Sequence, residues 1–416
     1  MLPRMARFEF ATGNARKLLA LPLYALGALA GLVVPRSRRR WVFGSGQGIG
    51  EGALALYRHA AERDPALRLD WLARDRSDRD RAAELGIASV VKTGPRGLWR
   101  TLRAGVVVVT HGFGDVNRFG ARGGFLVQLW HGIPLKLIQL DSPATTRLSF
   151  PGGWRLRPLL RRFYRRGYRA IGLLPAASEL SAERLRTAFG LTADRVVVTG
   201  DPRDDVLSPG DPTGARAALF AALGTADDGS RVLLYAPTWR DGDPDPGVPS
   251  ARQWTSLAAY LEESGSLLLL RPHPLGVGDY RDGLSASPRI RLLGSDLVAE
   301  ITPLLPAVDL LITDYSSIAF DFSLTGGPIL FLAPDEAAYV SSRGLYEPYR
   351  EFSGGRAVRD WDGLLGQLRR LDADPFWAAE VAAHSETLEH RHFRYTDGGN
   401  TGRVYALVRA RIGGRR

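Results

Sequence analysis

Two histidines follow short apolar runs and are the first candidates for chemistry. His131 comes directly after Phe125–Trp130, and His273 comes shortly after Leu267–Leu270. Imidazole is the usual general base near neutral pH, so a histidine on a loop at a strand end suits proton transfer. Lys136, within one turn of His131, adds a positive charge, and the prolines on both sides of His273 fix its backbone. A structural role in an ordinary turn remains the alternative for each histidine.

A second kind of corner carries hydroxyl groups. The apolar run Leu310–Thr313 ends in Asp314-Tyr315-Ser316-Ser317, and a helix is predicted to follow. Serine hydroxyls and the unpaired N–H groups of a helix start form a ready site for an anion. We therefore predict that Ser316 and Ser317 hold a phosphate.

Two more strand ends carry arginine. Thr238, Trp239 and Arg240 follow the run Val232–Tyr235, and Arg203 lies in Gly200–Asp205. Corners that are rich in N–H and O–H donors and poor in carboxylates favour recognition of phosphate or pyrophosphate. Pairing of Arg203 with Asp204 or Asp205 is an equally weighted alternative. The spacing of carboxylates and histidines predicts no metal site, and no cofactor is expected.

Alternating strands and helices must position these corners. The apolar runs predict an α/β fold with two Rossmann-like domains that face a cleft. A helix is predicted over 181–189, with Ser181 as its N-cap, and the last helix, near 401–412, is expected to pack on the first domain. The predicted parts are a membrane-associating segment (1–40), a first domain (41–200), a linker (201–228), a second domain (229–390) and a closing motif and helix (391–416).

The net charge of +11 at pH 7 predicts an anionic partner. Leu18–Val34 is an uncharged run at the lower length limit for a membrane span, and it is followed by Arg36, Arg38, Arg39 and Arg40. We favour an interfacial anchor over a spanning helix or a signal peptide. The chain contains no cysteine, which excludes disulfides and thiolate metal sites.

A stretch of arginines and aromatic residues gives a second candidate membrane contact. Its arginines are Arg155, Arg157, Arg161, Arg162, Arg165, Arg166 and Arg169, interleaved with Trp154, Phe163, Tyr164 and Tyr168. This pattern suits a helix on an anionic membrane surface that binds a lipid-linked acceptor. A nucleic-acid patch and a plain solvated basic face are the alternatives; the first is not favoured.

Together the motifs resemble the CDP-glycerol glycerophosphotransferase family of teichoic acid and capsule synthesis. The resemblance rests on WHGIPLK, GDPRDDVL, YAPTWRD, RPHP, DLLITDYSSIAFDF and the closing DGGNTGRV, in this order. Glu51-Gly52 departs from it, because an Asp-Asn pair is expected after the first loop. The resemblance implies a GT-B-like fold, a CDP-glycerol or other CDP-polyol donor, and attack of an acceptor hydroxyl on the β-phosphorus with release of CMP.

The resemblance also implies roles for the residues above. His131 is the expected general base, and His273 is the second expected catalytic residue. The expected donor-binding residues are Gly132, Pro134, Leu135, Lys136, Arg203, Thr238, Trp239, Arg240, Arg271, Pro272, Ser316, Ser317 and Asp321. The acceptor is expected to be lipid-linked or polymeric, with the protein on the cytoplasmic face of the cell membrane. A nucleotide-sugar glycosyltransferase and a non-enzymatic basic protein that binds membrane or nucleic acid are the alternatives.

Overall fold

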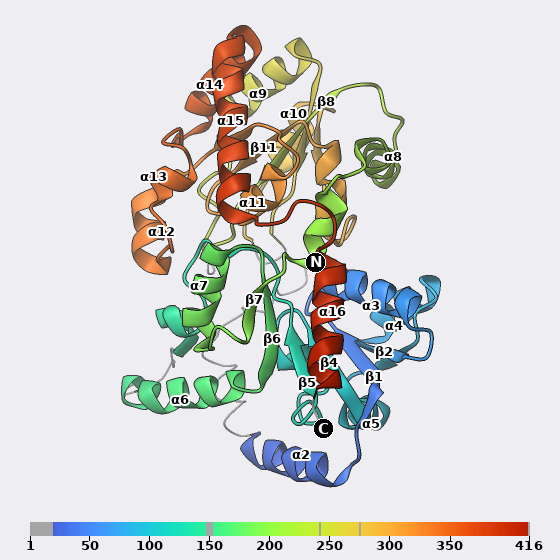
Figure 1. Ribbon diagram of the computed structural model, residues 1–416. Coiled ribbons are helices and arrows are strands. Elements are labelled where there is room, and N and C mark those ends of the chain that lie inside the picture. Colours follow the sequence, from blue (N-terminus) through green and yellow to red (C-terminus); the bar gives the residue numbers. More distant parts are fainter. Residues whose placement is uncertain (1–19, 147–152, 241–242, 274–275, 415–416) are drawn as a thin grey trace. The chain divides into compact units, whose positions relative to one another are not determined.

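The computed structural model describes residues 20–146, 153–240, 243–273 and 276–414 (Figure 1). The described chain divides into two compact units. The first holds residues 20–133, 138–205 and 393–414, and the second holds residues 134–137 and 206–392. The division at Asp205 lies close to the predicted boundary. Residues 206–228 belong to the second unit, however, and do not form a separate linker.

The first unit is built on a seven-stranded sheet whose paired strands are all parallel, in the order β3-β2-β1-β4-β5-β6-β7. Its strands are β1 (Ser37–Gly44), β2 (Arg68–Ala73), β3 (Ser89–Val91), β4 (Ala104–Val109), β5 (Phe125–Gln128), β6 (Ile171–Ala176) and β7 (Val196–Val198). The valines of β4 are fully buried, as expected for a central parallel strand covered on both faces. The strand order reverses between β1 and β4, and ligands of open α/β sheets bind at such a switch point.

Helices cover this sheet. They are α2 (Leu21–Val33), α3 (Glu51–Arg63), α4 (Arg76–Glu84), α5 (Pro95–Arg103), α6 (Arg157–Tyr168), α7 (Glu179–Phe189) and α16 (Asn400–Gly413). The prediction of Ser181 as N-cap is wrong: Ser178 caps α7, and its hydroxyl accepts a hydrogen bond from the Ser181 N–H. Ser178 is the N-cap because it has an extended backbone and lies just before the first helical turn.

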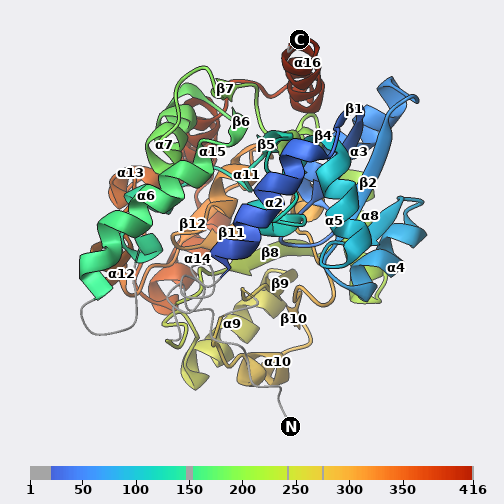
Figure 2. The same ribbon diagram turned by 90° about the horizontal axis from the view of Figure 1, so that it is seen from below.

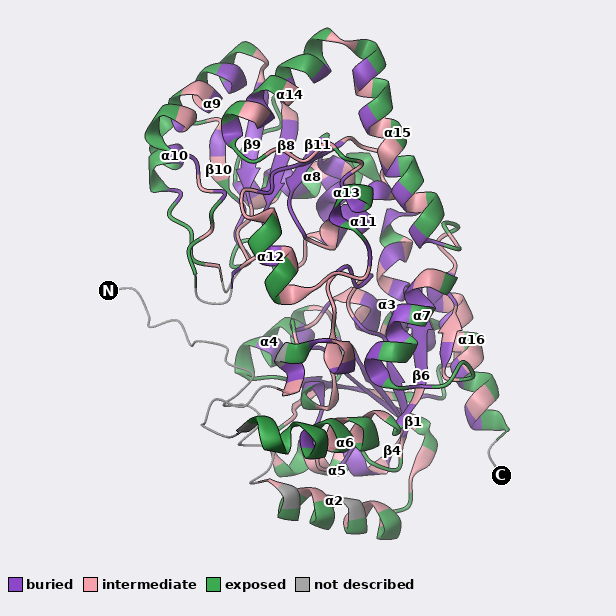
Figure 3. Cartoon of the chain, turned by 90° about the vertical axis from the view of Figure 1, so that its left-hand side faces the viewer, coloured by how far each residue is buried: buried purple, intermediate pink, exposed green. Residues whose placement is uncertain are grey.

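The last helix, α16, returns to the first unit, as predicted. Its apolar residues Val404, Val408 and Ile412 share a buried cluster with the α3 residues Leu56 and Ala60. Figure 3 shows the same division in each unit, with buried strands and exposed outer faces of the helices. The closing segment is therefore part of the core of the first unit.

Two sequence motifs meet where α16 begins. The Asp205 carboxylate accepts hydrogen bonds from the N–H groups of Asn400 (2.9 Å) and Thr401 (2.8 Å), which caps the helix. Gly200 has a positive φ of 76°, and a Cβ there would lie 1.9 Å from the Asn400 side-chain oxygen. Glycine is therefore required at position 200 for both its conformation and its lack of a side chain.

The second unit is built on a five-stranded parallel sheet in the order β10-β9-β8-β11-β12. Its strands are β8 (Arg231–Ala236), β9 (Ser266–Leu270), β10 (Ile290–Leu292), β11 (Leu310–Thr313) and β12 (Ile329–Phe331). Its helices are α8 (Pro212–Leu223), α9 (Ala251–Glu263), α10 (Arg281–Ala286), α11 (Ile318–Ser323), α12 (Glu336–Arg343), α13 (Tyr349–Phe352), α14 (Trp361–Ala373) and α15 (Pro375–His392). The order reverses between β8 and β11, so the predicted Thr238 and Asp314 corners lie at a switch point.

The segment after His131 contributes to the second unit. The N–H of Leu137 donates to the Gly344 carbonyl (3.0 Å), and the N–H of Tyr346 donates to the Leu135 carbonyl (2.9 Å). Lys136 forms an antiparallel bridge with Leu345. The motif WHGIPLK is thus divided: its histidine belongs to one unit and its lysine to the other.

Helix α2 has 13 residues and packs on the first unit, with the Tyr24 ring 5.1 Å from the Phe119 ring. Across the described part of the chain, no helix combines the length and apolar character needed to cross a bilayer. Residues 1–19 of the predicted N-terminal segment lie outside the described residues.

Candidate active site

A chain of hydrogen bonds joins the ends of β1 and β4 in the first unit. The Ser45 hydroxyl donates to the Glu51 carboxylate (3.2 Å), and the Thr110 hydroxyl donates to Ser45 (2.9 Å). The Thr110 hydroxyl also contacts Nδ1 of His111 at 2.8 Å. A half-buried carboxylate is thereby connected to an imidazole through two hydroxyl groups.

His111 lies against the predicted base. The rings of His111 and His131 are stacked, with centroids 4.1 Å apart and planes 3° from parallel. Nδ1 of His131 makes a long contact of 3.5 Å with the Thr110 carbonyl oxygen. A carbonyl only accepts, so a hydrogen bond here has Nδ1 as its donor. In that tautomer Nε2 is the nitrogen that can take a proton.

The backbone is strained on both sides of this cluster. Glu51 and Trp130 have positive φ angles of 52° and 68°, which residues other than glycine rarely adopt. Such strain persists only where the surrounding structure fixes it, and it concentrates at functional sites. Both residues adjoin the hydrogen-bonded cluster: Glu51 is a member of it, and Trp130 precedes His131.

Burial shifts the titration of this cluster. It raises the pKa of Glu51, which the nearby charge of Arg203 opposes. It also lowers the pKa of His111, against the attraction of Asp115. The Asp115 carboxylate accepts hydrogen bonds from the N–H groups of Thr110 (2.9 Å), His111 (2.6 Å) and Gly112 (3.1 Å), and so fixes the loop. The arrangement favours a neutral His111 near neutral pH.

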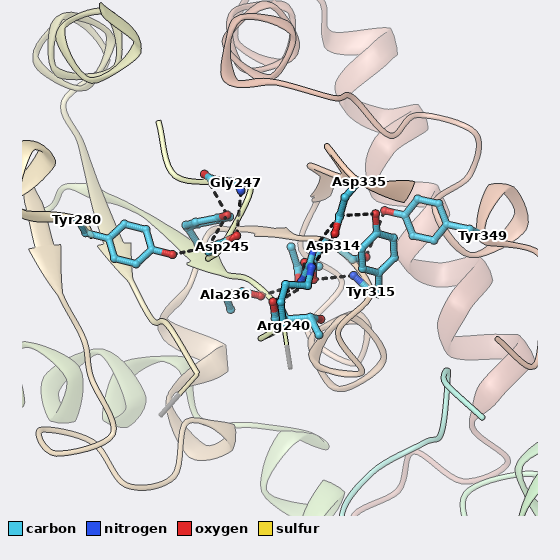
Figure 4. Close-up of polar contacts among 12 residues, drawn as sticks. Ala236, Arg240, Asp245, Gly247, Tyr280, Asp314, Tyr315, Asp335 and Tyr349 are labelled. Atoms are coloured by element: carbon cyan, nitrogen blue, oxygen red, sulfur yellow. Dashed lines mark hydrogen bonds and ion pairs between the residues drawn. The ribbon is translucent and has the colours of Figure 1, made fainter. Parts of the chain in front are cut away.

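The corner of the second unit is held by ion pairs (Figure 4). Asp314 accepts hydrogen bonds from the N–H groups of Thr238 (2.8 Å) and Tyr315 (2.6 Å), and it pairs with Arg240 at 3.1 Å. Arg240 also holds Asp335 through two hydrogen bonds of 2.8 Å each. Arg240 was predicted to bind the donor. Its guanidinium is instead engaged by two carboxylates, so the geometry assigns it to positioning the corner, and direct contact with the donor stays a prediction.

Three positive or titratable groups gather at the end of β9. The Arg271 guanidinium donates to the Leu293 carbonyl (3.0 Å), and burial lowers its pKa to about 10. Burial, Lys136 and Arg271 together lower the pKa of His273 to about 4. The His273 ring stacks on Trp239 at 5.6 Å and 18°. The structure therefore brings together Lys136, Trp239, Arg271 and His273, which the sequence had placed in three motifs.

Hydroxyl groups complete this corner. Ser316 and Ser317 are half-buried, whereas Asp321 is buried within α11. The Thr238 hydroxyl is buried and has no hydrogen-bond partner among the described residues. An orphaned buried hydroxyl is costly unless something outside the protein satisfies it, which is consistent with a ligand contact.

A family model described as CDP-glycerol:poly(glycerophosphate) glycerophosphotransferase matches residues 30–410. The chain belongs to this glycerophosphotransferase family. The match covers both units, with every sequence motif noted above inside it. It confirms the family that the motifs indicated.

The chain is similar to a teichoic acid polymerase and to a teichoic acid primase. The chain is 28% identical over 282 residues to the teichoic acid ribitol-phosphate polymerase TarK of Staphylococcus aureus, covering 67% of this chain and 51% of that protein. It is 26% identical over 277 residues to the teichoic acid glycerol-phosphate primase of Bacillus subtilis, covering 66% of this chain and 65% of that protein. The chain spans about half the length of the ribitol-phosphate polymerases TarK and TarL.

A solved structure supports the fold. The wall teichoic acid polymerase TagF superposes with a TM-score of 0.74 at 21% identity, covering 98% of each chain. At this identity the likeness shows the α/β fold alone.

Sequence reasoning missed part of the candidate site in the first unit. His111, Ser45 and Asp115 were not predicted, and Glu51 was noted only as a departure from the family pattern. The position of His111 at the end of the apolar run Val106–Val109, with only Thr110 between, was an available signal, since a histidine after an apolar run also identified His131. Arg203, expected at the donor, lies in the first unit, where its charge acts on Glu51 and His111.

A surface pocket of about 440 Å³ lies between α3 and the start of α16. It is lined by Arg58, His59 and Arg63, among others, and by none of the predicted site residues. It is therefore separate from the residues of the candidate active site.

Proposed function

We propose that this chain transfers a glycerol-phosphate or related polyol-phosphate unit from a CDP-activated donor to an acceptor hydroxyl and releases CMP. The match of residues 30–410 to the glycerophosphotransferase family carries this proposal. The geometry supports it, because each parallel sheet presents its polar cluster at a topological switch point. The acceptor is a lipid-linked or polymeric chain, as in synthesis of teichoic acid.

On the acceptor side, the first unit supplies the base. The acceptor oxygen attacks the β-phosphorus as its proton passes to Nε2 of His131. The bond between the β-phosphorus and the bridging oxygen breaks, and the electron pair leaves with CMP. The contact of Nδ1 of His131 with the Thr110 carbonyl supports this role for His131.

On the donor side, the second unit supplies positive charge and hydroxyl groups. Arg271 and His273, with Lys136 close enough to shift the titration of His273, suit a pyrophosphate. Ser316, Ser317 and the orphaned Thr238 hydroxyl add hydrogen-bond donors. Developing negative charge on the leaving phosphate is stabilised by such preorganised donors.

We further propose that the two Rossmann-like units form a GT-B-like enzyme. Two separate units, each with a parallel sheet and a switch point, support this architecture.

A membrane contact of the first unit is the last part of the proposal. Helices α2, α5 and α6 gather at one end of this unit (Figures 1 and 2). On α2, Leu26, Leu29 and Leu32 are 62%, 59% and 83% exposed. All seven arginines predicted to contact the membrane are exposed, and so is Leu159 of α6. Apolar side chains beside arginines suit an anionic bilayer surface, which supports a location on the cytoplasmic face of the cell membrane.

The test is release of CMP from CDP-glycerol and CDP-ribitol in the presence of a glycerol-phosphate-primed lipid acceptor. Wild type is expected to release CMP in proportion to extended acceptor. His131→Ala and His273→Ala are each expected to lose at least a hundredfold in rate. His390→Ala, on the exposed end of α15, is the matched control and should keep the wild-type rate. Absence of CMP release by wild type from both donors would overturn the proposal.

A further inference from the structure

His111 belongs to the first-unit cluster but has no role in the proposed transfer. The residues around the His111 ring fit closely against it. Its Nδ1 contacts the Thr110 hydroxyl, and a Cβ at position 46 would lie 2.7 Å from its Cγ. Gly46 is therefore what leaves room for the imidazole.

The hydrogen-bond chain favours one tautomer of His111. Each hydroxyl has one proton to donate: Ser45 gives its proton to Glu51, and Thr110 gives its proton to Ser45. The Thr110 hydroxyl can then only accept from His111, so Nδ1 carries the proton. With Glu51 ionised, the lone pair of His111 is on Nε2.

His131 has the same arrangement. Its Nδ1 contacts the carbonyl oxygen of Thr110, the residue whose hydroxyl contacts Nδ1 of His111. The two rings are 3° from parallel with centroids 4.1 Å apart. One residue thus contacts Nδ1 of both stacked imidazoles, and in the Nδ1–H tautomer each ring presents Nε2 as an acceptor.

We propose that His111 binds the hydroxyl next to the attacking one, so that the acceptor end recognised by the first unit is a 1,2-diol. His131 takes the proton of the attacking hydroxyl, and Nε2 of His111 accepts a hydrogen bond from the hydroxyl on the adjacent carbon. This inference rests on the proposed function and adds a specificity-determining residue to it. An alcohol without the second hydroxyl would leave Nε2 of His111 desolvated and unpaired, which a site built for a hydroxyl penalises.

The experiment compares two acceptors that differ in one hydroxyl. One ends in glycerol phosphate with a free 1,2-diol, and the other lacks the hydroxyl next to the attacking one. For wild type, kcat/KM is expected to be roughly tenfold to a hundredfold lower with the deoxy acceptor. His111→Phe keeps a flat ring against His131 and removes the acceptor nitrogen. It is expected to use both acceptors equally.

Two results would overturn the assignment: equal use of both acceptors by wild type, or full discrimination by His111→Phe. If His111→Phe does not fold, Ser45→Ala replaces it, because losing the link to Glu51 should reduce the discrimination at least threefold. A ¹⁵N NMR spectrum of histidine-labelled wild type gives a readout without turnover. The Nδ1–H tautomer of His111 is expected near neutral pH, and the Nε2–H tautomer would contradict the proposal. Failure of wild type to release CMP at all would instead count against the proposed function.

Discussion

Nε and Nη2 of Arg240 each donate a hydrogen bond of 2.8 Å to the Asp335 carboxylate. Its third nitrogen pairs with Asp314 at 3.1 Å, and the side chains of Arg240 and Asp314 are only 8% and 3% exposed. Removing one partner of a buried pair leaves the other charge without compensation, which costs about 3–5 kcal/mol. Arg240→Ala is therefore expected to lower the melting temperature strongly. Arg252→Ala, which removes an exposed pair with Asp362, should change stability by less than about 1 kcal/mol. Equal effects of the two substitutions would contradict this assignment.

Ser316 is expected to act on the donor and not on the acceptor. Ser316→Ala removes a hydroxyl from the second-unit corner, together with a long contact (3.5 Å) in which that hydroxyl accepts from the N–H of Ile318, the first residue of α11. Loss of one hydrogen bond to a charged phosphate predicts a rise of roughly tenfold in KM for the CDP-polyol. KM for the acceptor should stay within twofold. The reverse pattern in steady-state kinetics would mean that Ser316 is wrongly assigned to the donor site.

The positive φ of Glu51 allows its backbone strain to be measured separately from its carboxylate. Glu51→Ala and Glu51→Gly both remove the hydrogen bond from Ser45, but only glycine relieves the left-handed conformation. The glycine variant is expected to be more stable than the alanine variant by about 1 kcal/mol. Thermal unfolding of the pair measures the difference, and an alanine variant as stable as the glycine variant would show that the backbone relaxes elsewhere.

The folded-state pKa of His273, about 4, predicts a pH dependence of stability. An unfolded histidine titrates near 6.5, so between pH 6.5 and about 4 the unfolded state binds a proton that the folded state does not. The contribution of His273 is therefore fully present above pH 6.5 and is lost as the pH falls toward 4. His273→Gln should show a smaller decrease in melting temperature than wild type across this window. Parallel curves would contradict the predicted shift.

The basic face of α6 predicts binding to anionic vesicles. At about 1 kcal/mol per arginine near the surface, replacing Arg161, Arg162, Arg165 and Arg166 by Gln should weaken binding by at least tenfold. The control replaces four exposed arginines of the second unit, which are Arg252, Arg281, Arg369 and Arg370. Both variants lose the same net charge. Co-sedimentation with phosphatidylglycerol vesicles measures the difference, and equal weakening would indicate a plain charge effect without a membrane face.

Most strands could be predicted from sequence because they are apolar runs bounded by turn residues. The runs at 267–270 and 310–313 correspond to β9 and β11, with ends within one residue of those predicted. The polar residues at the strand ends could be predicted to lie together, because residues that follow such runs must lie at the carboxyl edge of a parallel sheet. Family resemblance then gave the chemistry.

The partners within each corner could not be predicted. Asp335 is separated from Arg240 by 95 positions, and nothing in the local sequence pairs them. The stacking of His111 on His131 depends on β4 and β5 being neighbours in the sheet, which is a property of strand order. The division within WHGIPLK was also hidden, because Pro134–Leu137 has no change in composition that marks a boundary.

The interleaving of the two units has a consequence for how the gene can be divided. A cut after Asp205 would separate most of the first unit from α16, whose Val404, Val408 and Ile412 fill its core. The same cut would leave Pro134–Leu137 on the wrong fragment. No single breakpoint produces two self-sufficient pieces, so a crossover between related genes cannot exchange one unit whole. A single crossover therefore transfers parts of both units at once.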